Sequence, residues 1–268
     1  MNTVPSTDPA PDAPILLFDS GVGGLTVLAE LRALLPDAPV LYFADGAALP
    51  YGEKTEAEIA ARVAGLLGRL SERYRPRLAC IACNTASTIA LGMVREVLEI
   101  PIVGTVPAIK PAAVQTASGT IGLLGTQATI RQVYVDRLEA EFAADKHLIR
   151  HAAPDLVTAA EAKLAGGRPD MDAIRDAVAG LREAEGGGHI DTVVLACTHF
   201  PLLAEELRAE LGAGVSLVDG AAGIARRIAA LTQGQRFARN RPDTFLTTGS
   251  APPETALAPY GLTQIERF

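Results

Sequence analysis

Several features that would mark other classes of protein are scarce or missing in this sequence. Lys and Arg form no cluster and the net charge is −7, which disfavours general nucleic-acid binding because phosphate neutralisation needs clustered positive charge. No stretch approaches the roughly 18 uncharged apolar residues of a membrane-spanning helix. The chain has only three cysteines and no export signal, which indicates free thiols and a cytoplasmic location.

Residues 1–14 lack the positive charge and the apolar core of a signal peptide. Their polar, proline-rich composition predicts a disordered leader instead. The whole chain is 49% hydrophobic and 21% charged, which is ordinary globular composition. Its 268 residues are enough for two α/β units or one large domain.

Apolar runs of strand length alternate with amphipathic runs of helix length. Continuous apolar strands separated by helices are typical of parallel sheets covered on both faces, so an α/β fold is predicted. The expected helices include residues 24–35, 55–70, 129–142 and 201–211, and Thr55 with Glu58 forms a capping box. The expected strands are residues 15–18, 40–43, 78–82, 102–104, 120–124, 147–151, 192–196, 215–218 and 244–249.

A weak internal repeat divides the chain into two similar halves. In each, a strand, a small polar loop and a helix are followed by a strand that ends in Ala-Cys-polar. The separation is 64 residues from Asp19 to Cys83 and 71 residues from Thr126 to Cys197. We therefore expect two α/β domains, residues 15–106 plus 218–268 and residues 107–217, with residues 244–249 returning to the first.

Ligands of parallel α/β sheets bind beyond the carboxyl ends of the strands, where this chain places short polar loops. In "DSGVGG" (19–24), backbone N–H groups and Ser20 could hold a small anion, with Asp19 positioning another group. This loop lacks the third glycine of a dinucleotide fingerprint and the lysine of a P-loop. With "CNTAS" (83–87), "GTQAT" (125–129) and "CTHF" (197–200), it predicts a single site.

Cys83 and Cys197 each stand between a strand and a helix start, where the helix N-terminus favours a thiolate. A single such cysteine is more often an inert buried residue, but two copies in matching contexts favour a functional pair. Cys80 lies three positions before Cys83, so it faces the other side of the strand and should pack in the core. A zinc site formed by Cys80, Cys83, Cys197 and His199 would require the Cys80 side chain to point to the opposite face of its strand.

Two thiols that face one cleft from two halves suit racemisation. One thiolate removes a proton from carbon while the opposed thiol delivers a proton to the other face. Asn84, Thr85 and Thr198 are available to stabilise the developing negative charge. No lysine lies in a Gly- or Ser-rich phosphate loop, so pyridoxal phosphate chemistry is not expected. The prediction is a reaction without a cofactor or a metal.

Six motifs in order, "FDSGVGGLTVL", "PYGEKT", "ACNTAS", "PIVGTVP", "IGLLGTQATIRQVY" and "ACTHFPLL", closely resemble the glutamate racemases of the aspartate/glutamate racemase family. The resemblance covers about residues 15–230. It implies two pseudo-twofold α/β domains, a site in the cleft between them, no cofactor, and D-glutamate production for peptidoglycan. It also implies that Cys83 and Cys197 are catalytic, with Asp19 and His199 assisting. The implied substrate-binding residues are Asp19, Ser20, Tyr51, Gly52, Asn84, Thr85, Thr126, Thr198 and His199.

Some details depart from the family pattern. Gly46 stands where many relatives have Thr, and Phe200 where Tyr is common. The resemblance alone assigns Cys83 to the D-enantiomer and Cys197 to the L-enantiomer. Two other functions stay open from the residues: a racemase of aspartate or another acidic amino acid, and a non-catalytic amino-acid binding module. The expected partner is a small-molecule substrate, without nucleic acid or membrane, and the chain could form a homodimer.

Overall fold

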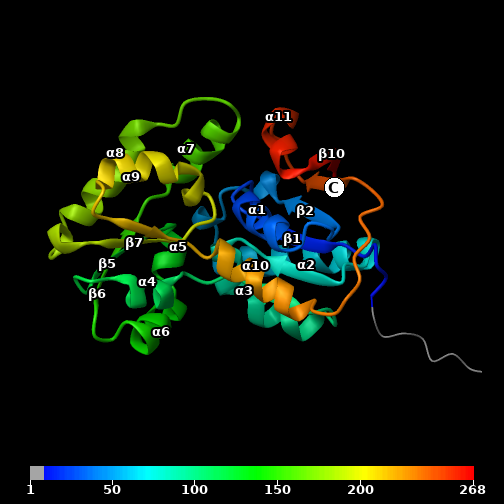
Figure 1. The fold of residues 1–268 in the computed structure, drawn as a ribbon, viewed down its shortest axis with the longest axis horizontal. Coiled ribbons are helices and arrows are strands. Elements are labelled where there is room, and N and C mark those ends of the chain that lie inside the picture. Colours follow the sequence, from blue (N-terminus) through cyan, green and yellow to red (C-terminus); the bar gives the residue numbers. More distant parts are fainter. Residues whose placement is uncertain (1–8) are drawn as a thin grey trace, which may run out of the picture.

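The protein has two lobes, each built on a parallel β-sheet covered by helices on both faces (Figure 1). A computed structural model describes residues 9–268. The first sheet has the strand order β10-β9-β2-β1-β3-β4 and the second β6-β5-β7-β8. Every strand pair in both sheets is parallel. The predicted α/β fold with two mainly parallel sheets is confirmed.

The first lobe contains the beginning and the end of the described chain. Its strands are β1 (Ile15–Asp19), β2 (Val40–Ala44), β3 (Leu78–Ile81), β4 (Ile102–Gly104), β9 (Asp243–Thr247) and β10 (Leu262–Arg267). Its helices are α1 (Leu25–Leu34), α2 (Glu56–Tyr74), α3 (Asn84–Val97), α10 (Ala221–Leu231) and α11 (Glu254–Leu257). The capping box predicted at Thr55 is present and begins α2.

The second lobe contains the middle of the chain. Its strands are β5 (Thr120–Gly125), β6 (His147–Ala152), β7 (Thr192–Leu195) and β8 (Ser216–Val218). Its helices are α4 (Ile109–Gln115), α5 (Gln127–Ile130), α6 (Val133–Phe142), α7 (Asp155–Leu164), α8 (Met171–Arg182) and α9 (Ala204–Leu211). The helix expected over residues 129–142 is divided between α5 and α6.

The chain crosses between the lobes twice, after β4 and after β8. The crossings lie side by side, because a Cβ added at Gly220 would be 3.5 Å from Thr105 Oγ1. After the second crossing, β9 pairs with β2, which confirms that residues 244–249 return to the first half. Val218 pairs with Val194, so it belongs to the second sheet, one residue beyond the expected boundary.

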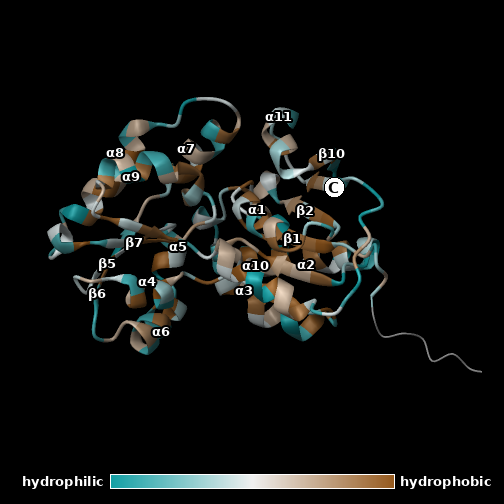
Figure 2. Ribbon diagram, in the orientation of Figure 1, coloured by the Kyte–Doolittle hydropathy of each residue, from teal (hydrophilic) through white to brown (hydrophobic). Residues whose placement is uncertain are grey.

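Both faces of each sheet are buried, which explains the continuous apolar strands. In β1, Ile15 and Leu17 pack with α1 and α10, while Leu16 and Phe18 pack with α2 and α3. The strands carry the hydrophobic residues and the outer helix surfaces the polar ones (Figure 2). Cys80 is fully buried in the α1 and α10 core, as expected from its strand position.

Two details of the first lobe were not predicted. Strand β10 was missed because its sequence, LTQIER, mixes polar and apolar residues at the sheet edge. The disorder predicted for residues 1–14 lies partly outside the described residues and is wrong for residues 10–13. There the Arg77 guanidinium donates hydrogen bonds to the carbonyls of Ala10, Pro11 and Ala13, at 2.8 to 3.0 Å.

Candidate active site

The two sheets turn the carboxyl ends of their strands toward one small cavity. Ten of the residues predicted for the site line it, together with Leu49, Pro50 and Val157. The ten are Ser20, Tyr51, Gly52, Cys83, Asn84, Thr85, Thr126, Cys197, Thr198 and His199. Asp19 is fully buried behind this lining. The loops expected to meet at one site therefore do meet, with contributions from both lobes.

Cys83 is the N-cap residue of α3, directly after the β3 strand. Its Sγ lies 3.5 Å from Ala86 N at the helix start and 3.5 Å from Ser20 Oγ. Burial raises the pKa of the Cys83 thiol to about 12, the nearby Asp19 charge adds to the rise, and the two hydrogen bonds only partly oppose it. Cys83 is therefore held as the protonated thiol, a proton donor.

Cys197 follows β7 and lies beside an imidazole. Cys197 Sγ is 3.9 Å from His199 Nδ1, and His199 Nε2 is 2.8 Å from Glu161 Oε1 on α7. Burial acts to lower the pKa of His199, but hydrogen bonds to Cys197 and Glu161 outweigh it and raise that pKa well above its ordinary value. The imidazolium form is thus favoured, which places a positive charge beside the Cys197 sulfur.

Asp19 connects the two thiol environments. Its Oδ1 accepts a hydrogen bond from Gly21 N at 2.9 Å, and its Oδ2 accepts one from Thr198 Oγ1 across the lobes at 3.0 Å. Burial raises the pKa of Asp19, while His199 and these two donors act in the opposite direction. Thr198 is thereby oriented by the first lobe although it belongs to the second.

Hydroxyl and amide groups cover the remaining wall. The hydroxyls of Thr85, Thr126 and Thr129 lie 3.0 to 3.1 Å from one another, with Thr85 from the first lobe and the other two from the second. The buried Asn84 Oδ1 has no hydrogen-bond partner among residues 9–268. Since a buried polar atom without a partner is costly, this oxygen is suited to accept a hydrogen bond from a ligand.

The sequence analysis missed five residues of this site: Glu161, Thr129, Leu49, Pro50 and Val157. Glu161 lies in α7 and matches no motif that could have indicated contact with His199. Thr129 lies inside the loop "GTQAT" that was predicted, but its hydroxyl was not singled out. Leu49 and Val157 supply apolar walls, which have no signature of their own.

The cavity measures only about 20 Å³, which is room for one water molecule. Its walls come from both lobes and touch closely: a Cβ at Gly52 would be 2.8 Å from Thr126 Cβ. An exposed hydrogen bond from Gln132 to Glu56, 2.8 Å long, also joins the lobes. The cavity in this arrangement of the lobes is therefore smaller than an amino acid.

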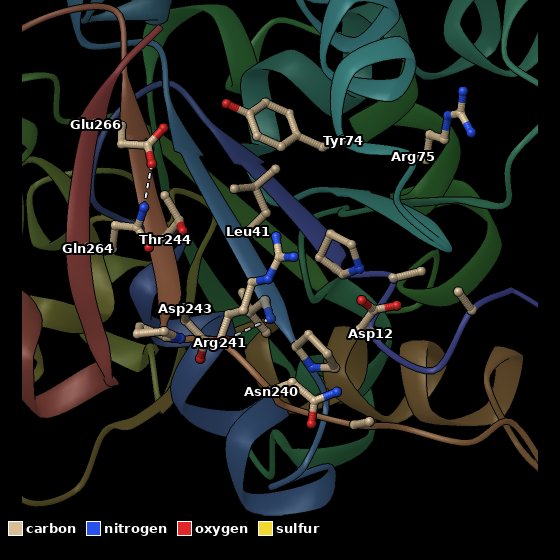
Figure 3. Close-up of a pocket in the computed structure, with 17 residues that line it drawn as sticks. Asp12, Leu41, Tyr74, Arg75, Asn240, Arg241, Asp243, Thr244, Gln264 and Glu266 are labelled. Atoms are coloured by element: carbon tan, nitrogen blue, oxygen red, sulfur yellow. Dashed lines mark hydrogen bonds between the residues drawn. The ribbon is translucent and has the colours of Figure 1, made fainter.

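A larger cavity, of about 390 Å³, lies at the opposite edge of the first sheet, where β2 and β9 begin (Figure 3). Its labelled side chains include Asp12, Tyr74, Arg75 and Arg241, and it contains none of the predicted site residues. Ligands of parallel α/β sheets bind at the carboxyl ends of strands, so the smaller cavity is the better candidate despite its size.

The zinc alternative conflicts with this geometry. Cys80 packs in the core on the opposite face from Cys83. Within residues 9–268, no three His, Cys, Asp or Glu side chains are grouped so that they could hold a metal ion. Over the same residues, no helix is long and apolar enough to cross a membrane.

Two lobes built on parallel sheets are the fold of a class of α/β racemases with solved structures. The chain belongs to the Asp/Glu/Hydantoin racemase family, whose model matches residues 26–228.

Named relatives extend this match over nearly the whole chain. The glutamate racemase of Sphingopyxis alaskensis is 63% identical over 263 residues, which are 96% of this chain and 98% of that protein. The glutamate racemase of Escherichia coli K12 is 48% identical over 229 residues, 85% of this chain and 79% of that protein. A crystal structure of E. coli glutamate racemase with L-glutamate and the activator UDP-MurNAc-Ala has a TM-score of 0.87 and 42% identity, covering 96% and 98% of the two chains.

Proposed function

We propose that this protein interconverts L-glutamate and D-glutamate by proton transfer at the α carbon between two cysteines. The observation that carries the proposal is the placement of Cys83 and Cys197, one from each lobe, on the walls of one cavity. Two features of the comparisons support glutamate as the substrate: the most similar relatives reported above are named glutamate racemases, and the E. coli structure contains L-glutamate.

The environments of the two thiols suit opposite roles. Cys197, beside the His199 imidazolium, is the base that takes the α proton of L-glutamate: the C–H bond breaks and an S–H bond forms. Cys83, held as a thiol, donates its proton to the other face of the carbanion and becomes a thiolate. The result is D-glutamate, and the reverse reaction uses the same groups with their roles exchanged. The assignment of each thiol to an enantiomer follows the family resemblance.

Negative charge develops on the α carbon and its carboxylate during this transfer. The hydroxyls of Thr85, Thr126 and Thr198 are already placed at the cavity and need little reorganisation to donate to that charge. Asn84 Oδ1, which lacks an internal partner in the described chain, accepts a hydrogen bond from the substrate ammonium. The chain supplies each of these groups itself, so the proposed mechanism requires no cofactor.

The test is racemisation of each glutamate enantiomer, followed by polarimetry, together with α-deuterium incorporation from D₂O. The wild-type protein is expected to racemise both enantiomers and to exchange the α proton, and Cys83→Ala and Cys197→Ala to lose racemisation in both directions while remaining folded. Turnover retained in either variant would remove that cysteine from the mechanism. Faster turnover of aspartate would replace glutamate as substrate, and glutamate binding without exchange would indicate a binding module.

The cellular role follows from the proposed reaction: D-glutamate would be supplied for peptidoglycan synthesis in the cytoplasm. A strain whose growth depends on added D-glutamate offers a direct test, since expression of this protein should remove that requirement. Persistent dependence on D-glutamate with active protein present would contradict the role. A homodimer stays a prediction, which light scattering of the purified protein can check.

A further inference from the structure

The wall of the cavity formed by residues 49–52 belongs to the loop that follows β2. This loop, residues 45–53, contains two short 3-10 helices, Gly46–Ala48 and Tyr51–Glu53. It begins with Asp45, whose side chain is fully buried. A loop that supplies substrate contacts must be held in place, and the contacts of Asp45 show what holds this one.

The Asp45 carboxylate accepts hydrogen bonds from three different segments. Tyr51 OH, from the same loop, donates to Oδ2 at 2.6 Å. Arg62 on α2 donates through Nη2 to Oδ1 at 2.7 Å and also through Nε to Oδ2. Thr248 Oγ1, just after β9, donates to Oδ1 at 2.6 Å. The carboxylate therefore ties the cavity residue Tyr51 to α2 and to the end of β9.

Thr248 makes a second hydrogen bond to the same loop through its hydroxyl. Ala47 N donates to Thr248 Oγ1 at 3.1 Å, and Thr248 N donates to the Ala44 carbonyl at 3.2 Å. The backbones also touch, since a Cβ at Gly249 would be 2.7 Å from the carbonyl carbon of Gly46. Thr248 thus supports both the buried carboxylate and the backbone of the loop.

The charge state of Asp45 is consistent with this arrangement. Burial acts to raise the pKa of Asp45, but the hydrogen bonds from Arg62, Thr248 and Tyr51 outweigh it and lower that pKa. The carboxylate stays ionised, and charge-assisted hydrogen bonds of this kind are stronger than neutral ones. Loss of one donor would therefore weaken the whole connection.

We propose that Thr248 and Arg62 are positioning residues for the substrate, because they fix the 45–53 loop through Asp45 and so place Tyr51 and Gly52 in the cavity. Neither residue lines the cavity itself. The proposal rests on the proposed function, since it concerns the binding of glutamate. It assigns a role in substrate binding to Thr248, which is far from both cysteines in the sequence.

The two thiols are positioned by other elements. Cys83 is set by β3 and α3, and Cys197 follows β7. Loosening the 45–53 loop should therefore weaken substrate binding more than proton transfer. If Thr248 and Arg62 had a purely structural role, their substitution would lower the free energy of unfolding without raising KM more than it changes kcat.

The first experiment measures kinetics of Thr248→Val, which is nearly isosteric but cannot form either hydroxyl hydrogen bond. KM should rise about tenfold for both enantiomers, the effect of losing a hydrogen bond to a charged group, with kcat changed less than about twofold. Thr248→Ser, which keeps the hydroxyl, should restore the wild-type KM. Thr232→Val is the matched control, because within residues 9–268 the Thr232 hydroxyl bonds only to its own helix, and its KM should not change.

Arg62→Gln provides a second variant that is expected to fold, since the Arg62 side chain is 38% exposed. It should show the same rise in KM. An unchanged KM in both Thr248→Val and Arg62→Gln, or a fall in kcat alone, would overturn the proposal. Failure of Thr248→Ser to restore KM would also overturn it, because the hydroxyl is the group invoked.

A second measurement is independent of the substrate. Hydrogen–deuterium exchange of the peptide that contains residues 45–53 should be faster in Thr248→Val than in wild type and normal in Thr248→Ser. If the wild-type protein does not racemise glutamate but the exchange result holds, the proposed function fails while the loop support stands. If the protein is active and the exchange is unchanged, the proposed role of Thr248 is wrong.

Discussion

Gly23 lies where the first lobe packs closely against the second, and a single added methyl group there should lower kcat/KM about 100-fold. A Cβ at this position would lie 2.4 Å from Thr198 Oγ1 and 2.6 Å from His199 N, both in the second lobe. The φ angle of Gly23 is outside the left-handed region, so alanine fits the backbone. The effect of Gly23→Ala is therefore steric and acts between the lobes.

The size of the effect follows from the overlap. Ordinary contact begins at 3.4 Å, so Thr198 would have to move by about 1 Å. This displacement breaks the Thr198–Asp19 hydrogen bond and shifts Cys197, its neighbour in sequence. Misplacement of a reacting group by about 1 Å costs about 100-fold in rate, which is ~2.7 kcal/mol in the activation free energy.

The assay is racemisation of both glutamate enantiomers, with thermal unfolding to show that each lobe is intact. Gly65→Ala is the matched control: outside its own helix, its Cβ would meet no atom of residues 9–268 within 4 Å, and Gly65 lies inside α2. That variant should keep full activity and gain about 1 kcal/mol of stability, since alanine is the better helix former. A Gly23→Ala protein with kcat/KM within about threefold of wild type would refute the reasoning.

Three further predictions concern groups at the cavity. Because the pKa of His199 is raised in the folded protein, its protonation stabilises the fold fully below the ordinary pKa of about 6.5, and this stabilisation is lost as the pH rises through the raised pKa. Glu161→Gln should make the free energy of unfolding fall less between about pH 6 and about pH 9 than it does in wild type, as measured by urea unfolding. The same fall in the variant and in wild type would contradict this prediction. Alkylation of Cys83 by iodoacetamide, followed by mass spectrometry, should keep accelerating above about pH 9, because its pKa is raised to about 12; a plateau near pH 9 would show an ordinary thiol. Asn84→Ala should raise KM about tenfold for both enantiomers in the racemisation assay, whereas an unchanged KM would remove Asn84 from substrate binding.

The parts of this fold that the sequence predicts are those with strong local patterns. Nearly continuous apolar runs such as those of β1 and β7 require two covered faces, and their alternation with helical patterns indicates the parallel α/β class. The loops that carry Cys83 and Cys197 could be assigned to one site because each follows the carboxyl end of a parallel strand, where ligands bind, and the internal repeat provides one such loop from each half. Strand β10 could not be predicted, because an edge strand that is half polar lacks such a pattern.

The parts that escaped prediction depend on contacts between distant segments. Glu161 acts through His199, and neither helix periodicity nor a motif connects the two positions. Asp45 was not singled out in the sequence, and its partner Thr248 is 203 residues away. In both cases the side chain is ordinary in its local sequence, and only tertiary packing within one lobe brings the partners together: α7 against the segment after β7, and β2 beside β9.

The side-by-side crossings at Thr105 and Gly220 have a consequence for biosynthesis. The second lobe is inserted into the first, so the ribosome makes it completely before β9 and β10 exist. Until those strands add to β2, the edge of the first sheet is uncovered and Asp45 lacks the Thr248 hydroxyl. The ribosome therefore makes all the residues that line the cavity before it makes the residues that complete the cavity's support.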